Sequence, residues 1–202
     1  ESTIFAAADS TGHGVPGAMV SVVCSNALNR AVKEFGLTDP AHILNKTRTI
    51  VIDTFARSGK DVKDGMDIAL CALTGNQLIY AGAHNPLWIV RKNDNIVTEI
   101  KAHKQPIGQH MVLTPFVSHT IELKDGDCFY IFSDGFSDQF GGSNGKKYKT
   151  VNFKKLLLSI QEKSMEDQKQ ILQETFNTWK GEIEQIDDVC VIGVRFSDKR
   201  VK

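Results

Sequence analysis

Three aspartates beside apolar segments are the residues best suited to chemistry in this sequence. Asp9 follows the run TIFAAA, Asp134 follows CFYIFS, and Asp187 lies in the pair Asp187–Asp188 directly before VCVIGV. Each stands where we expect a buried strand to meet a tight turn, so the three side chains could face one cleft. For any one of them alone, a turn or capping role is the better interpretation.

Taken together, the three aspartates favour a metal site. Two carboxylates about 4 Å apart repel each other by about 4 kcal/mol at an effective dielectric constant near 20. A third carboxylate adds to this repulsion, which a divalent cation would remove. Because all the ligand atoms would be oxygen, magnesium or manganese is the expected ion.

The segment after Asp9, DSTGHGVPG, also contains the G-x-G-x-x-G pattern of dinucleotide sites, formed by Gly12, Gly14 and Gly17. Its context argues against a nucleotide. The first expected helix is followed by a second helix rather than by a parallel strand with an acidic ribose ligand. Asp9 would also place a carboxylate beside the pyrophosphate. We therefore interpret the glycines as a sharp turn that starts a helix beside Asp9.

The apolar periodicity predicts an α+β fold with mainly antiparallel sheets covered by pairs of helices. We expect a first strand, a pair of helices, a series of strands, a second pair of helices and a closing strand. The strands are predicted at residues 3–8, 68–73, 77–81, 87–91, 96–100, 116–123, 128–133 and 189–196, and the helices at 16–35, 41–57, 153–163 and 167–179.

The composition indicates one ordinary globular domain over residues 1–202. Lys and Arg number 24, as do Asp and Glu, so the charge gives no reason to expect a nucleic-acid partner. Apolar runs are too short for a membrane span of roughly 20 residues, so we expect no membrane contact. The cysteines lie far apart in apolar runs, which favours reduced core thiols and a cytoplasmic location.

Five segments in order resemble the metal-dependent serine/threonine protein phosphatases: ADSTGHGVPGA, YAGAHNPLWIV, KQPIG, GDCFYIFSDGFSDQ and DDVCVIGVRF. The resemblance is to the SpoIIE-like branch of the PPM superfamily, which also contains the type 2C enzymes. It implies an α-β-β-α sandwich with two Mn²⁺ or Mg²⁺ ions at one edge. The implied activity is hydrolysis of phosphoserine or phosphothreonine on a partner protein in bacterial signalling, with no protein nucleophile.

The resemblance also assigns roles to residues. It implies that Asp9 bridges both metals, that the Ser10 carbonyl is a further ligand, and that Asp134 and Asp187 bind the second metal. Asp188 is expected to anchor its turn by hydrogen bonds, and Asn85, helped by His84, to fix a loop below the site. The supporting residues are Gly12, His13, Gly14, Asn85, Gly135 and Asp188.

Two departures from the family pattern matter. Type 2C enzymes have a histidine two positions after the bridging aspartate, where this sequence has Thr11, so we expect the nearby His13 to be structural. The family also has a metal-binding Asp in a strand before TIFAAA. We therefore expect an N-terminally truncated domain that lacks its first strand or strands and binds metal weakly. It would associate along the open edge, for example as a homodimer.

The resemblance further implies a phosphorylated regulatory substrate, such as an anti-sigma-factor antagonist, and an upstream sensor domain in the parent protein. A non-catalytic sensor or binding module on the same scaffold is the alternative, although three retained carboxylates argue against it. A zinc hydrolase is disfavoured because the histidines show no H-x-x-x-H spacing.

Overall fold

The computed structural model describes residues 2–12, 14–57 and 64–198. The chain divides into two compact units, one of residues 1–87 and 100–123, the other of residues 88–99 and 124–202.

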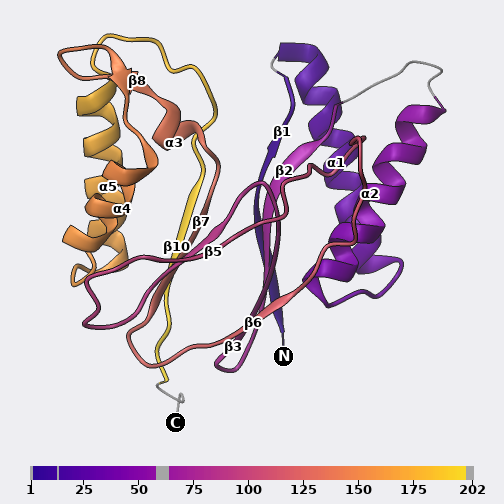
Figure 1. The fold of residues 1–202 in the computed structure, drawn as a ribbon, viewed down its shortest axis with the longest axis horizontal. Helices are drawn as coiled ribbons and strands as arrows, with labels where there is room; N and C mark the ends of the chain where they lie inside the picture. The colour runs from indigo at the N-terminus through magenta and orange to yellow at the C-terminus, as the bar shows by residue number, and fades with distance from the viewer. Residues whose placement is uncertain (1, 13, 58–63, 199–202) are drawn as a thin grey trace. The chain divides into compact units, whose positions relative to one another are not determined.

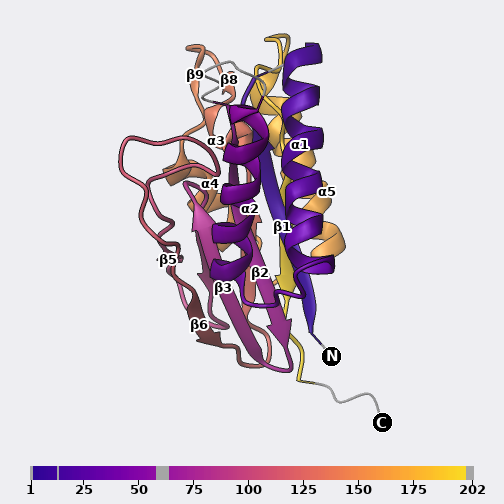
Figure 2. The ribbon, with the colours of Figure 1, turned by 90° about the vertical axis from the view of Figure 1, so that its right-hand side faces the viewer.

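The first unit is an antiparallel sheet with two helices. Its strands lie in the order β1-β2-β3-β6, and Figure 2 shows both helices across one face of the sheet. The strands are β1 (Thr3–Ser10), β2 (Met66–Thr74), β3 (Gln77–Ala83) and β6 (His119–Glu122), and the helices are α1 (Gly14–Lys33) and α2 (Pro40–Ala56).

The alternating direction of side chains along each strand decides which of them pack against these helices. Ile68 and Leu70 of β2 and Ala83 of β3 are fully buried in one core cluster with residues of α1 and α2. Because successive side chains of a strand point to opposite faces, Asp67, which directly precedes Ile68, lies on the face away from the helices. Asp9, which is paired with Asp67, lies on that same face.

The second unit is a sheet in the order β10-β7-β4-β5, in which β7 runs antiparallel to both its neighbours. In Figure 1, α4 and α5 lie along β7 and β10. The elements are β4 (Leu87–Val90), β5 (Thr98–Ile100), β7 (Cys128–Phe132), α3 (Gly135–Asp138), β8 (Phe140–Gly141), β9 (Lys146–Lys147), α4 (Thr150–Ser159), α5 (Met165–Lys180) and β10 (Val191–Arg195).

Aromatic packing holds the second unit together. The ring centroids of Trp88 and Phe132 are 4.3 Å apart, and those of Phe136 and Phe153 are 4.4 Å apart. Phe136 belongs to α3, so this short helix is attached to the core by a buried ring. The residue directly before it, Asp134, is thereby held at the end of β7.

The α+β class and the antiparallel sheets expected from the sequence are confirmed, with differences at several boundaries. The strand predicted at 116–123 is limited to β6, because both the N–H and the carbonyl of Phe116 bond to the Asn45 side chain of α2. α4 begins at Thr150 rather than at residue 153, after a chain reversal at Lys149, whose φ is +72°. α3, β8 and β9 were not predicted.

Cys24, Cys71 and Cys128 are buried and carry free thiols, which agrees with the expected core positions. None of the helices in the described ranges is long and apolar enough to cross a membrane.

Candidate metal centre

Asp9 lies near the end of an edge strand. It is half-buried and stands directly opposite Asp67 in the β1–β2 register. Its neighbour Ser10 ends the strand and turns its hydroxyl the other way, toward Cys24 of α1. Burial raises the pKa of the Cys24 thiol to about 11, and the hydrogen bond with Ser10 opposes this rise only in part. The Ser10 side chain thus faces the helices, and the Asp9 carboxylate faces away from them.

Thr11 fixes the chain directly after Asp9 and Ser10. Its N–H and its hydroxyl both donate to the Gly65 carbonyl, at 2.9 and 2.8 Å, and the hydroxyl accepts from the Gly65 N–H at 2.8 Å. Where type 2C enzymes have a histidine, this chain therefore has a residue that ties the end of β1 to the start of β2.

The glycines of the opening motif form a turn that other residues would strain. Gly12 and Gly14 have φ of +89° and +65°, a region that residues with a Cβ rarely occupy. A Cβ on Gly17 would lie 2.5 Å from the Gly12 carbonyl oxygen. The sharp turn is present and α1 begins at Gly14. His13 falls outside the described residues.

In the second unit, hydrogen bonds join the segments that carry Asp134 and Asp187. The buried Ser133 hydroxyl donates to the Asp188 carbonyl at 2.8 Å and accepts from the Cys190 N–H at 2.9 Å. The Ser133 N–H donates to the Cys190 carbonyl at 3.0 Å. One serine thereby fixes the register between the end of β7 and the start of β10.

Gln139 anchors the loop that precedes Asp187. It is fully buried, its Nε2 donates to the Glu184 carbonyl at 3.0 Å, and its Oε1 accepts from the Ile186 N–H at 3.4 Å. The indole N–H of Trp179 donates to the Gln139 carbonyl at 3.0 Å. Sequence reasoning assigned no role to Ser133 or Gln139. The available signal was the position of these two polar residues within the motif FSDGFSDQ.

The aspartates of this unit use their backbones for most of the turn bonding. Asp134 is the N-terminal cap of α3, yet its side chain makes no capping hydrogen bond. The Asp187 Oδ1 accepts the Asp188 N–H at 2.8 Å, and the Asp188 carbonyl is the one that bonds to Ser133. The Asp134 and Asp187 side chains are both exposed to solvent.

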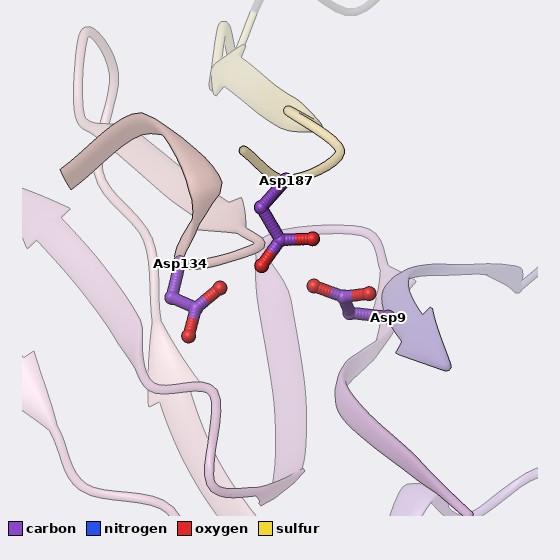
Figure 3. Close-up of side chains that lie close together, drawn as sticks. All are labelled: Asp9, Asp134 and Asp187. Carbon is purple, nitrogen blue, oxygen red and sulfur yellow. The ribbon is translucent and has the colours of Figure 1, made fainter. Parts of the chain in front are cut away.

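Figure 3 draws the three aspartate side chains. One carboxylate oxygen from each of Asp9, Asp134 and Asp187 lies within 4.8 Å of the other two. A set of three carboxylates supplies only oxygen ligands and a formal charge of −3, and it fits Mg²⁺ or Mn²⁺ better than zinc or copper.

Asn85 follows β3 and is buried. Its carbonyl accepts the Tyr80 hydroxyl at 2.6 Å, which fixes the backbone of the loop. Its Nδ2 has no hydrogen-bond partner within the described ranges. The role expected for Asn85 below the metal site stays a prediction.

Comparison with known proteins gives the family and the fold. The family model described as Stage II sporulation protein E (SpoIIE) matches residues 1–197. No curated protein sequence matches the chain. Among solved structures, the SiaA-PP2C domain of Pseudomonas aeruginosa is 28% identical, with a TM-score of 0.85 over 96% of this chain and 76% of that one.

Two further structures are similar in fold. The PP2C phosphatase domain of SpoIIE from Bacillus subtilis, solved with a fragment of its regulatory domain, is 18% identical, with a TM-score of 0.74 over 97% of this chain and 55% of that one. The RsbU and RsbW domains of a Mycobacterium tuberculosis protein are 21% identical, with a TM-score of 0.72 over 98% of this chain and 52% of that one. The present chain spans about half the length of these two.

Proposed function

The chain belongs to the SpoIIE family of PP2C-type phosphatase domains, and on this premise we propose that it hydrolyses phosphoserine or phosphothreonine on a regulatory protein of bacterial signalling. The observation that carries the proposal is the group of three carboxylates with oxygens within 4.8 Å of one another. A chain that only bound a partner would have no use for three carboxylates that repel one another.

In this proposal Asp9, Asp134 and Asp187 hold Mn²⁺ or Mg²⁺, and the Ser10 carbonyl is a further ligand on the Asp9 side. When bound, such a metal activates water for attack on phosphorus and offsets negative charge on the phosphoryl oxygens. The task of the chain is to hold the carboxylates in place before the metal arrives. Ser133 and Gln139 support this task for the second unit, since their hydrogen bonds fix the segments on both sides of Asp187.

The proposed substrate is a phosphorylated regulatory protein, with an anti-sigma-factor antagonist as the first candidate, and the proposed location is the cytoplasm. The relatives support this class because their names describe PP2C phosphatase domains and, in SpoIIE, an attached regulatory domain. A sensor domain in the same natural protein belongs to the proposal as well.

Hydrolysis of a phosphoserine peptide in the presence of Mn²⁺ tests the proposal. We expect release of phosphate that stops on chelation of the metal and falls at least about 10²-fold in Asp134→Asn. Asp53→Asn, an exposed carboxylate of α2, serves as the matched control and should keep full activity. Peptide binding without any Mn²⁺-dependent phosphate release would instead favour the non-catalytic module.

A further inference from the structure

A row of three polar residues crosses one end of the first sheet. Asp9 stands opposite Asp67 in the β1–β2 register. The β2–β3 register pairs Ile68 with Ala83, so the next residue, His84, extends the row beyond Asp67. Directly opposed residues of antiparallel strands have Cβ atoms about 4.5–5.5 Å apart. His84 is therefore separated from Asp9 by a single strand, and the residue on that strand is Asp67.

The histidine ring is hydrogen-bonded within this row. His84 Nδ1 lies 2.8 Å from Asp67 Oδ1. The two side chains are each 40% exposed, so a substrate can reach them. Since a carboxylate can only accept, Nδ1 carries the proton in this bond, and Nε2 is the ring atom left to act on a ligand.

The backbone holds His84 in an unusual conformation. Its φ is +57°, in the left-handed region that few residues other than glycine occupy. The His84 N–H donates to the His103 carbonyl at 2.9 Å, and the His103 N–H donates to the Gly82 carbonyl at 3.0 Å. These bonds fix the position from which the ring reaches Asp67. The backbone of His84 is thus fixed by hydrogen bonds, its ring is oriented by the Asp67 carboxylate, and a single strand separates it from the candidate metal ligand Asp9.

We propose that His84 is the general acid of the phosphatase reaction and that Asp67 is its positioning residue, an inference that rests on the proposed function. In the step, a water oxygen forms a bond to phosphorus while the bond from phosphorus to the serine or threonine oxygen breaks. The electron pair of the broken bond stays on the side-chain oxygen, which takes the proton on Nε2 of the His84 imidazolium and leaves a neutral ring with its proton on Nδ1. The proton lost by the water passes to solvent, and solvent returns a proton to His84.

The chemistry of the leaving group makes this role measurable. A serine alkoxide is a poor leaving group, and a positioned acid contributes about 10²–10⁴-fold to such a step. p-Nitrophenolate leaves readily without a proton. Hydrolysis of the phosphoserine peptide therefore needs an acid at Nε2, whereas hydrolysis of p-nitrophenyl phosphate depends on it much less.

The test compares His84→Asn with the unmodified protein in its natural form, on both substrates and with saturating Mn²⁺. Asparagine tolerates the left-handed backbone and cannot donate an acidic proton. We expect kcat on the phosphoserine peptide to fall about 10²-fold or more and kcat on p-nitrophenyl phosphate to fall less than about 5-fold, with Mn²⁺ affinity unchanged. Asp67→Asn should give a smaller loss with the same dependence on the substrate.

His110→Asn is the matched control, because His110 is exposed and its side-chain hydrogen bond within the described residues is local, with Nδ1 3.2 Å from the Val112 carbonyl oxygen. It should leave both rates unchanged. Three results for His84→Asn would overturn the inference and leave the proposed function standing. They are an equal loss of kcat on the two substrates, full activity on the peptide, or a loss of Mn²⁺ affinity. Absence of Mn²⁺-dependent hydrolysis by the unmodified protein would overturn both.

Discussion

Gly135 packs directly against the backbone of Asp188, so that a Cβ atom on Gly135 would lie 2.4 Å from the Asp188 carbonyl oxygen. This contact brings the residue after Asp134 against the residue after Asp187. The glycine is therefore required for the approach of the two segments.

Replacing this glycine should weaken metal binding more than it weakens the fold. In Gly135→Ala the added methyl group must push the Asp188 backbone away, because backbone cannot yield as a flexible side chain can. We expect Mn²⁺ affinity to fall about 10-fold or more, a change of at least about 1.4 kcal/mol. Calorimetric titration with Mn²⁺ measures this. Wild-type affinity in a folded Gly135→Ala protein would show that the contact does not matter for the site.

Ser133→Ala should reduce both stability and metal affinity. The substitution removes the hydroxyl that bonds to the Asp188 carbonyl and the Cys190 N–H, and it leaves these two groups without that partner. Each hydrogen bond contributes about 0.5–1.5 kcal/mol to stability, so urea unfolding can detect the loss of two. The matched control is Ser159→Ala, because among the described residues the exposed Ser159 hydroxyl bonds to the Leu156 carbonyl one turn earlier and to no distant segment. An equal effect in the two variants would contradict the role of Ser133.

Asp127 should make the second unit sensitive to acid. Burial raises the pKa of Asp127, but the Lys124 N–H, the Arg91 guanidinium and the Lys92 N–H together outweigh it, so the pKa lies below its usual value. The unfolded chain then binds the proton more readily than the folded one. The stabilisation is fully present above the ordinary aspartate pKa and is lost as the pH falls through the folded value.

Asp127→Asn should lower the free energy of unfolding at pH 7 by about 2 kcal/mol. This value lies within the range of about 1.5–3 kcal/mol for hydrogen bonds to charged groups. It should also flatten the dependence of stability on pH below about 4. Denaturant unfolding at pH 3 to 7 checks both effects. Parallel curves for the variant and the unmodified protein would contradict this assignment.

The buried thiols should resist modification. Burial raises the pKa of the Cys24 thiol to about 11 and that of Cys71 to about 12, so at pH 8 both are protonated and poorly nucleophilic. With Ellman's reagent we expect Cys190, which is half-buried, to react first, and Cys24 and Cys71 to react only on unfolding. Fast labelling of Cys71 in the native protein would refute this picture.

Long elements with a clear apolar pattern could be predicted from the sequence, and short ones could not. The run CFYIF predicted β7 with one residue too many at its C-terminal end, because five consecutive buried residues leave little alternative. β8 and β9 have two residues each, too few for any periodicity, and their pairing depends on the reversal between them. α3 spans four residues and is held by the packing of Phe136, which the sequence does not display.

The candidate metal ligands could be predicted because each aspartate adjoins an apolar run. The residues that hold them could not. Ser133 bonds to Asp188, 55 positions away, and Gln139 bonds to Glu184, 45 positions away. The row from Asp9 to His84 depends on strand register, and a slip of one residue would turn Asp67 to the opposite face of the sheet. Only the folded pairing reveals these relationships.

The central claim is that Asp9, Asp134 and Asp187 bind Mn²⁺ together, and calorimetric titration of the three single Asp→Asn variants tests it most directly. Each substitution removes one of the three carboxylates and its charge, so we predict a loss of affinity of about 10-fold or more in all three. The control Asp53→Asn should bind as the unmodified protein does. A variant of any one of the three aspartates that kept wild-type Mn²⁺ affinity while folded would contradict the account.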